Sequence, residues 1–70
     1  MTATVYRLKE DGERMKSCTT YIRVTKIEEF DLEVGEHWHK GIRLHTYWSD
    51  KGFCDPDVID ADLCDVEVEI

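Results

Sequence analysis

The chain has little of several things on which small proteins often depend. It contains one proline, four glycines and three cysteines, and no run that approaches the roughly 20 apolar residues of a membrane span. The odd number of cysteines (Cys18, Cys54 and Cys64) argues against a disulfide framework, and the first residues, MTATVYRLKE, lack the apolar core of a secretory signal. We therefore expect free thiols, a cytoplasmic location and no membrane contact.

Recognisable catalytic motifs are also missing. There is no glycine-rich phosphate loop and no Gly-x-Ser-x-Gly sequence. Cys54 lies beside Asp50 and Asp55, and neighbouring acids disfavour a reactive thiolate. A chain of 70 residues is also expected to be too short to enclose a substrate pocket of several hundred Å³. We predict a protein that is not an enzyme and that needs no cofactor.

Charge is the unusual feature of the composition. The chain has 16 acidic and 9 basic residues, for a formal net charge of −7. Residues 1–26 carry a net charge of +3, residues 27–49 of −3 and residues 50–70 of −7, so the excess of the whole chain equals that of its last segment. An acidic excess repels nucleic acid and attracts basic partners. We therefore expect no direct nucleic-acid binding and a partner protein with a basic surface or groove.

An alternation of apolar and polar residues with period two predicts strands rather than helices in the first third of the chain. The first strand is expected at Thr4–Lys9, followed by a turn at Asp11-Gly12. The second is expected at residues 17–27, which are rich in β-branched and aromatic residues. Because neither face of this second strand is strongly charged, we expect it to be central in the sheet, with Cys18 facing inward.

The third and fourth strands are expected to form a hairpin. Apolar residues and one threonine share a parity on both sides of the turn: Phe30, Leu32, Val34, Trp38, Ile42, Leu44, Thr46 and Trp48. A three-residue loop of His39-Lys40-Gly41 keeps this set on one face, because it pairs Trp38 with Ile42. We therefore predict that Gly41 closes the hairpin and that both tryptophans form much of the core.

The last third of the chain is expected to contain a short helix and a strand. Asp55-Pro56 is typical of a helix start, so we expect at most one short helix near residues 56–62. The stretch Cys64–Ile70 then alternates as a strand. The predicted fold is a single mainly β domain over residues 1–70, a small antiparallel sheet or half-open barrel of about four or five strands.

The last segment also carries a row of carboxylates. Outward residues two apart on a strand lie roughly 6.7 Å from one another, so Asp65, Glu67 and Glu69 would form a straight row. The predicted partner-binding residues are the acids of this segment and one outward aromatic: Asp55, Asp57, Asp60, Asp62, Asp65, Glu67, Glu69 and Tyr47. Such a row can replace a phosphate backbone in a cationic groove. The alternative is a solvated face, or an edge strand charged against aggregation.

Two metal sites are considered and not predicted. A calcium loop that begins at Asp55 would need glycine at its sixth place and glutamate at its twelfth, and the chain has Asp and Val there. His37 and His45 would share the outer face of the predicted hairpin with Glu33, a set that could hold zinc. Arg43 would lie opposite His37 and would disfavour a cation. We predict no metal, and keep a small His/Cys metal-binding domain as an alternative.

The function predicted from these features is that of a non-catalytic, inhibitor-like binding protein. Its acidic C-terminal surface would occupy a basic site on a partner, such as a nucleic-acid-binding site. Small acidic domains of this type are familiar among phage-encoded inhibitors that act in the host cytoplasm, which is an analogy and not a motif match. A second hypothesis is a self-associating assembly subunit, a homodimer for example, in which the basic N-terminal hairpin meets the acidic end of another copy.

Overall fold

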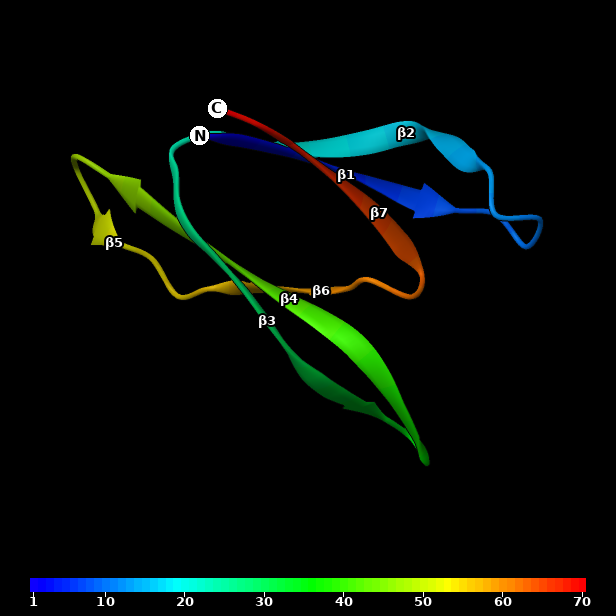
Figure 1. The fold of residues 1–70 in the computed structure, drawn as a ribbon. Coiled ribbons are helices and arrows are strands. Elements are labelled where there is room, and N and C mark those ends of the chain that lie inside the picture. The colour runs from blue at the N-terminus through cyan, green and yellow to red at the C-terminus, as the bar shows by residue number, and fades with distance from the viewer.

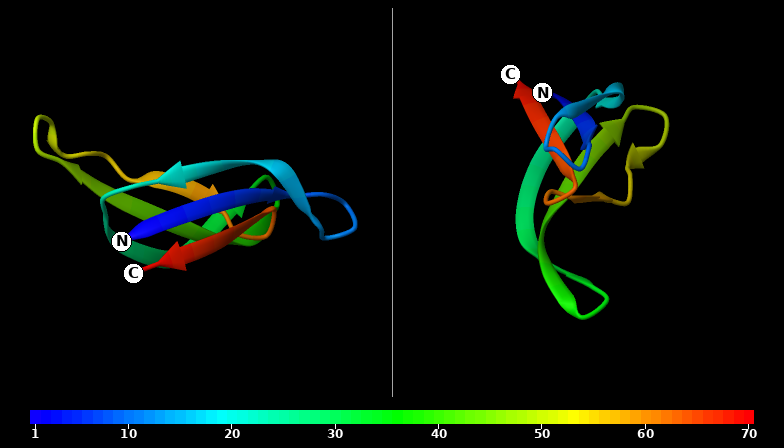
Figure 2. Two further views of the ribbon diagram at one scale, coloured as in Figure 1. Left: turned by 90° about the horizontal axis from the view of Figure 1, so that it is seen from above. Right: turned by 90° about the vertical axis from the view of Figure 1, so that its right-hand side faces the viewer.

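A computed structural model describes residues 1–70 and contains only β-structure. Its seven strands are β1 (Thr2–Leu8), β2 (Arg14–Tyr21), β3 (Val24–Val34), β4 (His37–Trp48), β5 (Gly52–Phe53), β6 (Asp57–Asp60) and β7 (Cys64–Glu69). They form two antiparallel sheets that do not close into a barrel (Figures 1 and 2). One sheet has the order β2-β1-β7; in the other, β4 pairs with β3 on one side and with β5 and β6 on the other. The mainly β fold is thus confirmed.

The first sheet has β1 at its centre, not the second strand as predicted. Ala3 and Val5 of β1 are buried, and they lie opposite Val68 and Val66 of β7. Strand β2 is an edge strand whose residues 14–20 are all exposed, so Cys18 faces solvent. The prediction of a central second strand is wrong because its threonines and cysteine, although typical of strands, provide too little apolar surface to be covered on both sides.

The single strand predicted at residues 17–27 is divided in two at Ile22-Arg23, where the chain passes from the first sheet to the second. Arg23 has φ 59° and is the only residue other than glycine with a positive φ. The backbone of Val24 then pairs with that of Met1, with N···O distances of 2.9 and 3.1 Å. A change of direction at Arg23 therefore lets both halves of this stretch remain hydrogen-bonded.

The β3–β4 hairpin closes four to five residues earlier than predicted. A two-residue turn, Gly35-Glu36, pairs Val34 with His37. Gly35 has φ 61° while Glu36 has a negative φ, the pattern of a type II′ turn with glycine first. Gly41 lies inside β4 and is buried, because the ring of Phe30 on β3 lies against it. The predicted loop at residues 39–41 is therefore wrong.

Trp38 is 68% exposed and is not part of the core. It pairs with Glu33 near the tip of the hairpin, and that tip extends away from the first sheet and from both termini (Figure 1; right-hand view of Figure 2). The radius of gyration is 12.8 Å, against roughly 11 Å for a compact chain of this length. No second layer covers the end of the hairpin, which is why the tryptophan there stays in solvent.

Residues 57–60 form strand β6 in place of the predicted helix. β6 pairs with Gly41–Leu44 of β4, with Ile59 opposite Ile42. The two β-branched residues Val58 and Ile59 suit this position, and pairing with the free edge of β4 outweighs the local helix-start signal of Asp55-Pro56. A turn at residues 61–63 then leads into β7.

The core lies between the two sheets and is small. Its buried side chains are Ala3, Val5, Val24 and Leu44. Half-buried residues packed against them are Tyr21, Ile27, Ile42, Ile59, Cys64 and Val66. Leu44, 1% exposed, is the only large side chain that is fully buried. A core of this size makes the domain marginally stable. The structure contains no helix that is long and apolar enough to cross a membrane.

Candidate functional site

The fold divides the predicted acidic residues into three separate groups, and the three that were predicted to form a row share strand β7. The first group is on β7, the second lies at the end of β6 beside β4, and the third precedes and begins β6. Their members are Asp65, Glu67 and Glu69; Asp60 and Asp62; and Asp55 and Asp57. Each group has different neighbours and therefore a different chemical capacity.

The carboxylates of β7 lie on the face of the first sheet that points away from the core, and Arg14 of β2 partly neutralises them. The Arg14 guanidinium is 2.7 Å from Oδ2 of Asp65 and 3.1 Å from Oε2 of Glu67. It reaches them across β1 by lying over the ring of Tyr6, 4.3 Å from the ring centroid. The basic N-terminal hairpin thus meets the acidic C-terminal strand within one chain, and Glu69 alone in this row has no basic partner.

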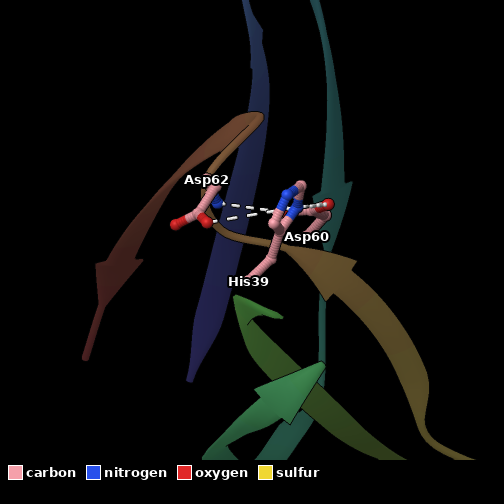
Figure 3. Close-up of side chains that lie close together, drawn as sticks. All are labelled: His39, Asp60 and Asp62. Carbon is pink, nitrogen blue, oxygen red and sulfur yellow. Dashed lines mark hydrogen bonds and ion pairs between the residues drawn. The ribbon is translucent and has the colours of Figure 1, made fainter. Parts of the chain in front are cut away.

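The second group surrounds His39 of β4 (Figure 3). Nδ1 of His39 lies 2.6 Å from Oδ2 of Asp60 and 4.0 Å from Oδ2 of Asp62. The hydrogen bond to Asp60 raises the pKa of His39, and the same contact holds the pKa of Asp60 below its ordinary value. Asp60 also accepts a hydrogen bond from the backbone N–H of Asp62, at 3.0 Å. The ion pair of His39 and Asp60 thus links the side chains of β4 and β6.

This cluster is also the set of side chains whose donor atoms, all within 4.8 Å of one another, come nearest to a metal site. A zinc ion holds nitrogen and oxygen ligands at roughly 2.0–2.2 Å, so two ligands on the same ion lie about 3 Å or more apart. The 2.6 Å contact between His39 and Asp60 leaves room for a shared proton only. Metal binding would therefore require the pair to separate and His39 to lose its proton.

The histidines that the predicted register placed together are apart. His37 pairs with Val34 at the hairpin turn and is exposed. His45 lies near the other end of β4, where Nε2 contacts Oε1 of Glu28 at 2.5 Å. This contact is the main reason why the pKa of Glu28 is lowered. The zinc set of His37, His45 and Glu33 is thus not assembled, because the turn lies at Gly35-Glu36.

The third group lies on the largest pocket of the structure, between the end of β2 and the segment that leads into β6. The pocket has a volume of about 530 Å³ and is open to solvent. Its walls are mainly aromatic and apolar, with two carboxylates: they comprise Thr20, Tyr21, Ile22, Thr46, Trp48, Cys54, Asp55 and Asp57. A volume of this size is typical of ligand sites. The chain thus forms an open pocket of this volume, although it does not enclose one.

The electrostatics of this pocket are negative. Burial raises the pKa of Tyr21, and the charge and hydrogen bonding of Asp57 raise it further. Neither Asp55 nor Asp57 has a basic side chain within ion-pair distance. The guanidinium of Arg23 lies 5.1 Å from the ring centroid of Trp48, but Arg23 does not line the pocket.

Tyr47, the predicted aromatic contact residue, is exposed and belongs to a pair. Its ring meets that of Phe53 edge to face, with centroids 4.9 Å apart. Phe53 is 79% exposed. Sequence reasoning did not select Phe53, although its position in a short segment between Gly52 and the acidic stretch was a usable signal. Exposed aromatic pairs of this kind are frequent at binding hot spots.

No family model, curated protein or solved structure matches the chain. Sequence reasoning missed the pocket because its walls come from three segments, residues 20–22, 46–48 and 54–57. Only the packing of the two sheets brings these segments together.

Proposed function

We propose that the chain is a non-catalytic binding protein whose acidic C-terminal segment contacts a basic surface or groove of a partner protein. By occupying that groove, the chain would block the binding of the groove's usual ligand, for example nucleic acid. The observation that carries the proposal is the lack of internal compensation. Among the acids of residues 50–70, only those beside Arg14 and His39 have a positive partner. The other four, Asp50, Asp55, Asp57 and Glu69, form no ion pair.

Carboxylates without an internal partner act mainly while the two proteins approach each other. They attract a basic partner over a distance of about one Debye length, roughly 8–10 Å at physiological salt. Once the proteins are in contact, the affinity depends on neighbouring apolar groups that lose their water. Tyr47 and Phe53 are exposed apolar groups that could make such contacts. Electrostatic steering raises the association rate more than the final affinity. The proposal therefore predicts binding that weakens steeply as salt rises.

The alternative is that the charge only keeps the protein soluble. Strand β7 is an edge strand, and charged side chains on edges prevent strand addition by other molecules. This explains the β7 row, and Asp57 also begins an edge strand, β6, but Asp55 and Asp57 line an apolar pocket as well. Self-association through opposite charges has less support, because Arg14 already contacts Asp65 and Glu67 within the chain.

The test is affinity capture from a lysate of the source cells with three matched proteins. They are the parent, the variant Asp55→Asn/Asp57→Asn/Glu69→Gln, and a control that removes three charges from the β3–β4 hairpin, Asp31→Asn/Glu33→Gln/Glu36→Gln. All six residues are exposed and lack ion pairs, so both variants should fold.

The parent and the control should retain the same nucleic-acid-binding protein, which duplex DNA and salt should both release. The C-terminal variant should not retain it. Equal retention by all three proteins, or retention that DNA leaves unchanged, would mean that the acidic segment does not bind a cationic groove. The three free thiols, Cys18, Cys54 and Cys64, fit a protein of a reducing cytoplasm, where we propose that it acts.

A further inference from the structure

The pocket beside β2 combines three features that together define a ligand class. It has two aromatic walls, Tyr21 and Trp48, and an exposed aliphatic residue, Ile22. It also has two carboxylates, Asp55 and Asp57, that the fold leaves without a cation. The pocket is open to solvent, so a group presented on the surface of another protein can enter it.

We propose that this pocket receives one arginine or lysine side chain of the partner protein. The aliphatic stem would pack against Trp48 and Ile22, and the cationic head would lie between Asp55 and Asp57. This inference rests on the proposed function and names the place where the partner is anchored. Long basic side chains are the group that needs both an apolar wall and a charged end, because their methylene stems are buried while their heads stay polar.

The structure supplies a related contact within the chain. The guanidinium of Arg23 lies 5.1 Å from the ring of Trp48, so this ring already attracts a cation. Arg23 is not among the residues that line the pocket. Its single positive charge leaves the two carboxylates in excess. A second cation in the pocket is therefore attracted by the carboxylates, and its apolar part meets the aromatic residues Tyr21 and Trp48 that line the same pocket.

Two other features of the surface define a ligand less clearly than this pocket does. The cluster of His39, Asp60 and Asp62 is satisfied by its own ion pair at 2.6 Å. The exposed pair of Tyr47 and Phe53 lines no pocket, so its geometry does not define an occupant. In the pocket, by contrast, the two carboxylates require a ligand with positive charge, and the apolar walls require one with an apolar stem.

The test uses the two tryptophans as reporters in the intact protein. Trp48 lines the pocket, and Trp38 lies exposed near the hairpin tip as an internal control. The protein is titrated with N-acetyl-L-arginine methylamide and N-acetyl-L-lysine methylamide while the two indole N–H signals are followed by ¹⁵N NMR. N-acetyl-L-norleucine methylamide provides a matched stem without charge. The basic probes should shift the Trp48 signal saturably, the neutral probe should not, and Trp38 should not respond to any of them.

A pair of matched variants then tests the carboxylates. Asp55→Asn/Asp57→Asn removes both charges, and the amide at position 57 still offers an oxygen to the Tyr21 hydroxyl. Binding of the basic probes should weaken about three- to tenfold, as for the loss of two exposed ion pairs. Asp31→Asn/Glu33→Gln removes the same charge from the hairpin and should leave the affinity unchanged. A Trp48 signal that never shifts, that shifts equally with norleucine, or that is insensitive to Asp55→Asn/Asp57→Asn would overturn the inference.

Failure of this inference differs from failure of the proposed function. If the probes do not bind but the parent still captures a protein that DNA releases, the acidic segment acts without an anchoring pocket. If the probes bind but no such protein is captured, the pocket exists and the inhibitory function is wrong.

Discussion

Replacing Gly41 with alanine tests the observed strand register most severely. The added Cβ would lie 2.7 Å from Cε1 and Cζ of Phe30 and 2.9 Å from Cβ of Leu32. Carbon atoms attract one another at roughly 3.5–4.0 Å, so the ring or the strand must retreat by about 1 Å. Overpacking of this kind costs roughly 1–3 kcal/mol.

Movement of the ring also weakens a second contact. The Arg43 guanidinium lies 3.7 Å from the Phe30 ring centroid, and such pairs contribute about 0.5–1 kcal/mol at exposed sites. We therefore expect Gly41→Ala to lower the free energy of unfolding by about 2–3 kcal/mol, out of roughly 3.5–10 kcal/mol for a domain of this length. The melting temperature should fall by roughly 10–20 °C.

Thermal and urea unfolding followed by circular dichroism would measure this, for Gly41→Ala, for Phe30→Ala and for the double variant. In the absence of the ring, the cost of Gly41→Ala should fall to less than half. A Gly41→Ala variant that melts with the parent would refute the reasoning. So would a cost that is the same with and without the Phe30 ring, because it would place Gly41 in a turn where only its backbone conformation matters.

Two further predictions concern the core and the His39 contact. Leu44→Ala should lower the free energy of unfolding by about 2–5 kcal/mol and leave the domain largely unfolded, because Leu44 is 1% exposed. Trp38→Ala should melt cooperatively near the temperature of the parent, because Trp38 is 68% exposed. A larger loss of melting temperature for Trp38→Ala than for Leu44→Ala would favour the register predicted from the sequence. The pKa of His39 is raised above its ordinary 6.5 and that of Asp60 lowered below 3.8, each mainly by their mutual hydrogen bond. The contribution of protonated His39 to stability is therefore complete below pH 6.5 and is lost as pH rises through the raised pKa of His39. The contribution of ionised Asp60 is complete above pH 3.8 and is lost as pH falls through the lowered pKa of Asp60. The stability difference between the parent and His39→Gln, measured by urea unfolding, should therefore be greatest between pH 3.8 and pH 6.5 and should shrink as pH rises through the raised pKa of His39. A difference independent of pH would contradict the assignment.

The fold class followed from the sequence because period-two alternation is a local property of each strand. The hairpin register did not follow, because the parity rule assumed that every apolar residue on one face is covered. β3 and β4 have 11 and 12 residues, against 7, 8 and 6 for the strands of the other sheet. The longer hairpin therefore extends past its cover and leaves Trp38 in solvent. The Gly35-Glu36 turn carried the usable signal, a glycine in the first place of a two-residue loop.

The charge pattern of the segments could be read directly, but the pairing of the charges could not. The contacts of Arg14 with Asp65 and of His39 with Asp60 join residues far apart in the chain. Both depend on which strands are neighbours. The seven acids predicted to form one binding surface therefore fall into three groups, of which the one at Asp55 and Asp57 adjoins a pocket that no local pattern reveals.

The most direct test of the central claim is surface plasmon resonance with the captured partner at two salt concentrations. Affinity of the parent should fall steeply with salt. Asp55→Asn/Asp57→Asn/Glu69→Gln should bind at least about tenfold more weakly, mainly through slower association. Arg14→Gln, which frees Asp65 and Glu67 from their internal partner, should associate faster than the parent. Equal affinity of all three proteins, or an affinity that salt does not change, would contradict the claim that the acidic segment binds a basic groove.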